Sequence, residues 1–172
     1  MADALAAHEA GRARAVEVRA SDYVGPGVGS NGHITRVLPA ALQGKAVSMV
    51  GRTDLPHSFT DVLDVARTLV AAAADEDSHG RTWMVPSNPA RSQEQALAEM
   101  LASAGKPPVT VRRLPAGMLR AMGFVSPMMR EIAQMSYQWT APYMVDDTAS
   151  RAHFGIEPTS WDEVCRRTVT GV

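Results

Sequence analysis

The stretch from Arg14 to Gly32 constrains the fold of this chain most, because it joins an apolar alternation to a glycine-rich loop. Val16 and Val18 alternate with charged residues, and this period of two predicts a β-strand with the valines on one face and Glu17 on the other. In open α/β sheets, ligands bind where loops leave the carboxyl ends of the strands. We therefore expect part of any site to lie directly after this strand.

The glycine-rich loop allows a second interpretation. Residues 27–32 read GVGSNG and match the G-x-G-x-x-G dinucleotide fingerprint, with a helix expected over 33–44 and Asp54 near the position of the ribose-binding acid. However, residues 22–26 separate the loop from the strand, and Pro26 removes a backbone N–H that a phosphate would need. A free-standing nucleotide-binding module that uses the Gly27–Gly32 loop is kept as an alternative.

Strand and helix signals alternate along the rest of the chain. After the first strand they predict, in order, a strand, a helix, a strand, a helix and a strand, over Lys45–Val50, Asp61–Ala74, Arg81–Val85, Ser92–Gly105 and Val109–Arg113. The helix over 61–74 would be a crossover connection, so the first strand should pair in parallel with Arg81–Val85. The pattern predicts an α/β fold.

Finer patterns predict which side chains face inward and where helices begin. An apolar stripe at helical spacing should bury one face of the 61–74 helix, through Val62, Val65, Ala66, Leu69, Val70 and Ala73. Ser92 with Gln95, and Ser160 with Glu163, have capping-box spacing. Two methionine-lined helices are expected within Leu114–Trp139.

Composition excludes several classes of protein. The chain has 172 residues, 45% hydrophobic and 20% charged, with a net charge of −1, so we expect a globular protein without nucleic-acid or membrane partners. There is no apolar run of membrane-spanning length and no signal-peptide h-region. The single cysteine, Cys165, cannot form an internal disulfide, which favours a cytoplasmic location. The histidines are scattered, and no metal-ligand spacing is found.

The segment Arg19–Gly27, RASDYVGPG, resembles a segment of the extended short-chain dehydrogenases, the NAD-dependent epimerase/dehydratase family. The family sequence reads arginine-proline-x-asparagine-x-tyrosine-glycine-proline-glycine, and Ala20 and Asp22 depart from it. The unit Gly51–Ala66 and the C-terminal segment Asp146–Trp161 resemble later motifs of the same family, in the same order.

This resemblance implies the C-terminal part of an extended Rossmann-type, NAD(P)-binding fold. Residues 1–32 would supply the last Rossmann helix, strand and loop, and residues 33–172 mostly the substrate-binding region with interleaved Rossmann elements. The resemblance places Ala20 and Ser21 beside the nicotinamide of NAD or NADP. It places Asp22, Tyr23 and His57 toward a small-molecule substrate. His57-Ser58 stands where nucleotide-sugar enzymes of the family have an arginine that meets phosphates, which argues against a nucleotide-sugar substrate.

The catalytic pair of the family, a tyrosine four residues before a lysine, is not found in this sequence. Its three tyrosines are followed four places later by other residues, Gly27, Ala141 and Asp147. We therefore predict the substrate-binding portion of an epimerase/dehydratase-type oxidoreductase, with no catalytic residue and no activity by itself. The resemblance implies the missing N-terminal half and a second copy in a homodimer as partners. Dimers of the family pack through the helix that carries the catalytic pair, and Met1–Gly11 resembles the tail of that helix. A non-catalytic structural protein is a further alternative.

Overall fold

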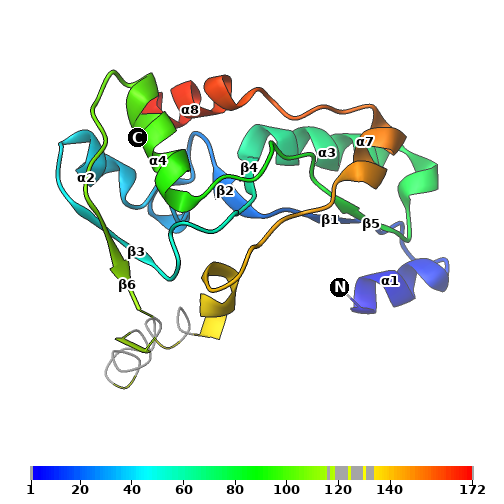
Figure 1. Ribbon diagram of the computed structural model, residues 1–172. Helices are drawn as coiled ribbons and strands as arrows, with labels where there is room; N and C mark the ends of the chain where they lie inside the picture. The colour runs from blue at the N-terminus through cyan, green and yellow to red at the C-terminus, as the bar shows by residue number, and fades with distance from the viewer. Residues whose placement is uncertain (1, 116, 119–123, 125–129, 131–133, 172) are drawn as a thin grey trace.

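The computed structural model describes residues 2–115, 117–118, 124, 130 and 134–171. Helices and parallel strands alternate, which confirms the predicted α/β class (Figure 1). In chain order the elements are α1 (Ala2–Glu9), β1 (Glu17–Arg19), β2 (Asp22–Val24), η1 (Gly29–Asn31), α2 (Leu38–Leu42), β3 (Val47–Val50), β4 (Phe59–Asp61), α3 (Val62–Ala74), η2 (Glu76–Ser78), β5 (Thr82–Met84), α4 (Gln93–Ser103), β6 (Val111–Leu114), η3 (Met135–Trp139), α7 (Thr148–Phe154) and α8 (Trp161–Thr170).

The described strands form three parallel pairs, β1 with β5, β2 with β4, and β3 with β6. In the first pair Val18 lies opposite Trp83, so the predicted parallel pairing of these two segments is confirmed. Asp22 lies opposite Phe59 in the second pair, which begins only three residues after β1 ends. The chain therefore changes strand partner between Arg19 and Asp22, and this change places residues 20–22 at an exit of β1.

One feature near this point was not predicted, and one local expectation is wrong. The side chain of Glu17, which was predicted on the face opposite to the valines, is buried and accepts hydrogen bonds from Thr82 Oγ1 at 2.8 Å and Arg19 Nη2 at 3.0 Å. The helix expected over 33–44 is reduced to α2, because the chain forms turns before Leu38, and Pro39 occupies the first turn of the helix.

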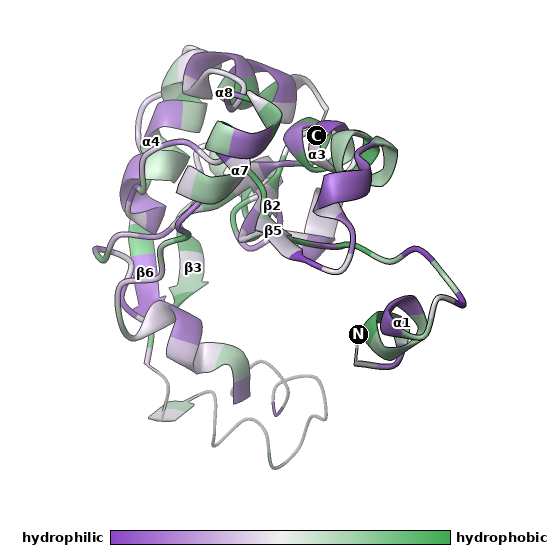
Figure 2. Cartoon of the chain, turned by 90° about the vertical axis from the view of Figure 1, so that its right-hand side faces the viewer, coloured by the Kyte–Doolittle hydropathy of each residue, from purple (hydrophilic) through white to green (hydrophobic). Residues whose placement is uncertain are grey.

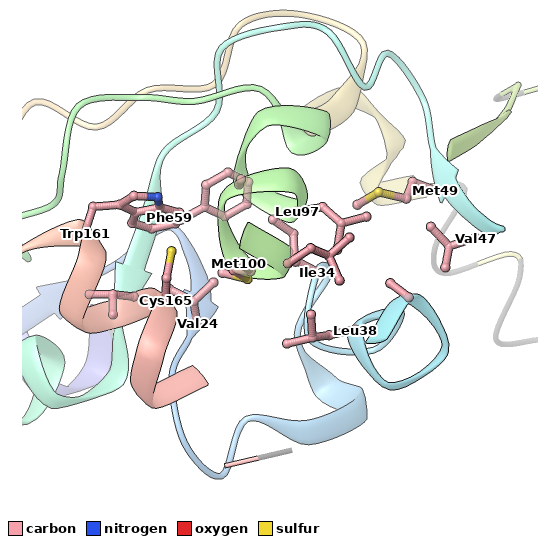
Figure 3. Packing of buried hydrophobic residues seen from close by; sticks show 14 residues of the cluster. Val24, Ile34, Leu38, Val47, Met49, Phe59, Leu97, Met100, Trp161 and Cys165 are labelled. Carbon is pink, nitrogen blue, oxygen red and sulfur yellow. The ribbon is translucent and has the colours of Figure 1, made fainter. Parts of the chain in front are cut away.

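The hydrophobic core lies between α2, α4, α8 and the strands β2, β3 and β4 (Figure 3). Its members share burial below a tenth of their surface: Val24, Ile34, Leu38, Ala41, Val47, Met49, Phe59, Ala96, Leu97, Met100, Leu101, Trp161, Val164 and Cys165. The capping box of Ser92 and Gln95 starts α4 as predicted. This core fixes β2 and β4, and with them the segment that contains Asp22.

Helix α3 buries the face opposite to the predicted one. Asp64, Thr68 and Ala72 are buried, whereas Leu69 and Val70 are exposed at 48% and 71%. Asp64 turns inward because its carboxylate accepts hydrogen bonds from the Thr159 backbone N at 2.7 Å and Thr159 Oγ1 at 2.8 Å. The periodicity of the helix was predicted correctly, but its orientation is set by this polar contact.

The C-terminal segment is tied to the end of β5 by polar contacts. Asp147 Oδ2 accepts from the Ser87 backbone N at 2.6 Å, and Arg151 donates to the Ser87 carbonyl at 2.7 Å. Gly155 ends α7 in the left-handed conformation. The predicted capping box at Ser160 is wrong: Ser160 makes no side-chain cap, and Glu163 pairs with arginines of its own helix. Most of the segment in which two methionine-lined helices were predicted lies outside the described residues.

Candidate functional site

The candidate site lies where the chain leaves β1 and enters β2. Ala20, directly after β1, is half-buried. Ser21 is fixed from both sides, because its Oγ donates to the Ser58 carbonyl at 2.5 Å and its backbone N donates to Thr60 Oγ1 at 3.2 Å. These bonds tie the exit of β1 to β4, so backbone and side chains here are held in one arrangement. Such order is a requirement for a binding site.

Asp22 is the charged centre of this region. Its Oδ2 lies 2.9 Å from His57 Nε2 and accepts a hydrogen bond from Trp139 Nε1 at 3.4 Å. Burial opposes ionisation, but His57, His33 and Trp139 outweigh it and hold the pKa of the Asp22 carboxyl below its ordinary value. Asp22 therefore carries a negative charge at neutral pH and keeps part of its side chain exposed. It can accept a hydrogen bond from a ligand hydroxyl or bind a cationic group.

His57 lies behind Asp22 and is 2% exposed. Its backbone exchanges two hydrogen bonds with Arg91, and its ring stacks on Tyr143 with centroids 5.1 Å apart. Nε2 is within ion-pair distance of Asp22 but is not aligned with it for a hydrogen bond. Because the ring is covered on its other sides by protein, His57 can influence a ligand through Asp22 rather than by direct contact.

Tyr23 is separated from this pair. Side chains alternate along a strand, so Tyr23 points away from the face that Asp22 and Val24 share, and it is about half exposed. The structure thus brings two of the predicted substrate residues, Asp22 and His57, into contact and places the third on the opposite face. Ala20 and Ser21 precede them along the same segment.

Three further residues belong to the site and were not singled out from the sequence. His33 stacks on Trp139 with ring centroids 4.5 Å apart, and its Nε2 lies 2.7 Å from Gln93 Oε1. Burial lowers the pKa of His33, although Gln93 and the Asp22 charge act against this shift. Isolated histidine, glutamine and tryptophan residues from three segments give no spacing signal, so only the fold could bring them together.

The glycine-rich loop does not form a phosphate cradle. Gly27 and Gly29 have positive φ, and a Cβ added to either would meet nothing within 4 Å. The loop leads into η1 and a turn, and the next helix is α2, which is five residues long and contains Pro39. The dinucleotide fingerprint instead requires a loop that opens directly onto a helix N-terminus. This geometry disfavours the alternative of a nucleotide-binding module built on Gly27–Gly32.

Two other classes of site are not found in the part of the chain that the structure describes. No group of three or more histidine, cysteine, aspartate or glutamate side chains there is arranged to hold a metal ion. None of the described helices combines the length and the apolar character that crossing a bilayer requires.

Comparison with known proteins finds one matching family and several similar solved structures. The sequence model of the NAD dependent epimerase/dehydratase family matches residues 2–85. A search of curated protein sequences gave no match. Among solved structures, RMD from Pseudomonas aeruginosa complexed with NADPH shares 15% identity, with a TM-score of 0.70 over 99% of this chain and 51% of its own.

Two further solved structures resemble the chain to a similar degree. The dTDP-glucose 4,6-dehydratase from Bacillus anthracis in complex with NAD has 15% identity and a TM-score of 0.72 over 99% of this chain and 48% of its own. The UDP-glucuronic acid 4-epimerase from Bacillus cereus, in complex with UDP-glucuronic acid and NAD, has 17% identity and a TM-score of 0.68 over 91% of this chain and 44% of its own. The chain therefore spans about half the length of the solved structures it matches.

Parallel strand–helix units with a polar site at a strand exit define an α/β protein of the Rossmann type. Residues 2–85 match, more particularly, the sequence model of the NAD-dependent epimerase/dehydratase family. The resemblance inferred from the sequence is thereby confirmed.

Proposed function

We propose that this chain supplies the substrate-binding half of an NAD(P)-dependent oxidoreductase of the epimerase/dehydratase type. The observation that carries the proposal is the coincidence of a family match over residues 2–85 with an ordered polar site, Asp22 and His57, at the exit of β1. The described chain overlays about half of each compared enzyme, and the compared structures bind NAD or NADPH.

Ala20 and Ser21 fit the nicotinamide end of such a cofactor, whereas the glycine loop does not fit its pyrophosphate. Ala20 and Ser21 offer a small, rigid surface on which a flat ring could lie, because Ser21 Oγ is turned away to the Ser58 carbonyl. No phosphate cradle accompanies it, since the glycine loop does not open onto a helix. We infer that Ala20 and Ser21 would lie beside the nicotinamide, while the pyrophosphate is held outside these residues. When bound, the cofactor would supply hydride transfer.

The chain's own residues would orient the substrate. Asp22, held as a carboxylate by His57 and Trp139, would accept a hydrogen bond from a substrate hydroxyl. His57 would act through Asp22, by fixing its charge and direction. Tyr23 would contact the substrate only where the substrate extends beyond the opposite face of β2.

The chemistry at this site also favours a class of substrate. A fixed negative charge at Asp22 repels phosphate and carboxylate groups, so the group next to Asp22 should be a hydroxyl or a cationic group. The buried His57 cannot replace an arginine that binds phosphates. We therefore expect a hydroxylated substrate that does not depend on a nucleotide diphosphate at this position.

A fluorescence titration with NADH tests the proposal. The chain alone should not bind NADH at micromolar concentrations, because one side of a cleft provides few of the contacts. The chain joined at Met1 to the polypeptide encoded in frame upstream should bind NADH and oxidise it with a suitable substrate. An upstream sequence without a glycine fingerprint and a tyrosine-x-x-x-lysine pair, or micromolar binding by the chain alone, would contradict the proposal.

A further inference from the structure

Asparagine occurs at two positions of the chain, and the residue after each one gives it a different reactivity. Asn31 is followed by Gly32, and Asn88 is followed by Pro89. Asparagine is thermolabile because its side chain loses ammonia when the backbone N–H of the next residue attacks the side-chain carbonyl carbon. Glycine has no Cβ and leaves that N–H unhindered, whereas proline has no N–H. The sequence therefore favours this reaction at Asn31 and blocks it at Asn88.

The structure leaves the side chain of Asn31 open to the reaction. Asn31 is exposed at the end of η1, and its side chain makes no hydrogen bond within the described part of the chain. Gly27 and Gly29 precede it with positive φ and open space around them, so no side chain at these two positions opposes a rotation of the backbone. The amide of Asn88, in contrast, is held by a hydrogen bond from Nδ2 to the Thr159 carbonyl at 2.8 Å.

The residues after Asn31 are fitted closely into the fold. Gly32 is buried, and a Cβ added to it would clash with Thr35 Oγ1 and lie 2.9 Å from the Tyr23 carbonyl oxygen. Tyr23 belongs to β2, which lies well inside the molecule in both views (Figure 1 and Figure 2). Ile34 is a member of the hydrophobic core (Figure 3). A longer backbone at Asn31 would therefore push Gly32 and Ile34 out of their contacts.

His33, directly after Gly32, connects this segment to the candidate site. The His33 ring is 8% exposed and stacks on Trp139 with ring centroids 4.5 Å apart. Trp139 Nε1 in turn donates to Asp22 Oδ2 at 3.4 Å. A shift of Gly32 would move the His33 ring, and with it the indole that helps to orient the Asp22 carboxylate.

We propose that Asn31 is a site of spontaneous covalent modification, at which its exposed side chain reacts with the backbone of Gly32 and thereby alters the candidate site. The Gly32 nitrogen forms a bond to Cγ of Asn31, ammonia leaves with the proton of that nitrogen, and a cyclic imide remains. Water then opens the imide at either of its carbonyl groups, which gives aspartate or isoaspartate. Water is the only other reagent, and either product adds one negative charge to the loop.

The two products should differ in their effect on the structure. Aspartate keeps the backbone of asparagine, and its charge remains solvated at this exposed position. Isoaspartate continues the chain through its side-chain carbon atoms and so lengthens the backbone by one methylene group before Gly32. Gly32 has no free space beside Tyr23 and Thr35. Isoaspartate should therefore displace His33 from Trp139 and weaken the site.

Mass spectrometry of the native chain, incubated at mildly alkaline pH and then digested with trypsin, tests the modification. The two asparagines fall in separate tryptic peptides, residues 20–36 and residues 82–91. The first peptide should gain the mass that corresponds to exchange of an NH2 group for an OH group, and part of it should be methylated by an isoaspartyl methyltransferase. The second peptide should stay unchanged. Asn31→Gln is the matched control, since it keeps an exposed amide but requires a larger ring, and it should block the reaction.

Tryptophan fluorescence during the same incubation tests the effect on the site. The emission should shift as isoaspartate accumulates, and this shift should be absent from Asn31→Gln and from Trp139→Phe, which removes the indole that stacks on His33. Conversion of Asn31 only after unfolding in urea, or equal conversion of Asn88, would overturn the modification site. Conversion in the native chain without a change in emission would overturn its effect on the candidate site. The test needs neither cofactor nor substrate, so its result is independent of the proposed function.

Discussion

The contact between Asp64 and Thr159 should be the main tie between α3 and the C-terminal segment, and Asp64→Ala tests it. The Asp64 carboxylate is buried, and it accepts two hydrogen bonds from Thr159, at 2.7 and 2.8 Å. Hydrogen bonds to a charged group contribute about 1.5–3 kcal/mol each, and the variant also leaves the two donors of the half-buried Thr159 without this partner. The Arg67 pair adds little because Arg67 is more than half exposed.

We therefore expect Asp64→Ala to lower the free energy of unfolding by about 3–5 kcal/mol, which is a large part of the stability of a typical domain. Urea titration followed by tryptophan fluorescence measures this, since Trp161 lies two residues after Thr159. Thr159→Val, which removes only the hydroxyl bond, should cost about 1–2 kcal/mol. Asp77→Ala, at an exposed acid in η2, is the control and should change stability by less than about 0.5 kcal/mol. A loss below about 1 kcal/mol for Asp64→Ala would refute the reasoning.

Three further predictions concern stability and reactivity. Gly25→Ala should destabilise the fold by about 2 kcal/mol or more, because φ is +120° and the new Cβ would come within 2.8 Å of Asp61 and Val62. Gly27→Ala, where φ is +82° and the space around the new Cβ is open, should lower the stability by only about 1 kcal/mol. Equal losses of stability for the two variants in thermal melts would contradict this prediction. Arg52 beside Asp54 lowers the pKa of the Asp54 carboxyl from 3.8 to about 2, so the contribution of this carboxylate to stability is present above pH 4 and is lost as the pH falls toward 2. In an acid titration, Asp54→Asn should therefore show a shallower loss of stability between pH 4 and pH 2 than the unaltered chain. An unchanged dependence of stability on pH would argue against this prediction. Burial raises the pKa of the Cys165 thiol to about 12, so Ellman's reagent at pH 8 should react only in urea, and fast reaction of the native chain would show the site to be open.

Much of the fold could be predicted because its signals are local. The strand–helix order, the parallel pairing of β1 with β5 and the capping box at Ser92 follow from period, loop length and cap chemistry. The orientation of α3 could not be predicted, because a stripe of apolar residues shows where a helix has two faces and not which contact decides between them. Here the orientation of α3 is set by the hydrogen bonds of Asp64 with Thr159, which is 95 positions away in the sequence.

The candidate site, like the fold, could be predicted from the sequence only in part. The segment around Asp22 was recognised because it is contiguous and resembles a family motif. The contact of Asp22 with His57 and Trp139 joins residues 35 and 117 positions apart, and no spacing rule connects them. The burial of Glu17 was not predicted for a similar reason, since its partner Thr82 is 65 positions away in the sequence, on the strand β5 that pairs with β1.

The central claim is that a cofactor would meet this chain at the exit of β1 and not at the glycine loop. NADH titration of the chain joined to the N-terminal half that the proposed function requires, followed by NADH fluorescence, tests it with two variants. Ala20→Trp would fill the space beside the expected nicotinamide, and the account predicts that it abolishes binding. Gly27→Ala should leave binding unchanged, because a Cβ there meets nothing within 4 Å. Normal binding by Ala20→Trp together with lost binding by Gly27→Ala would contradict the account and favour a nucleotide-binding loop at Gly27–Gly32.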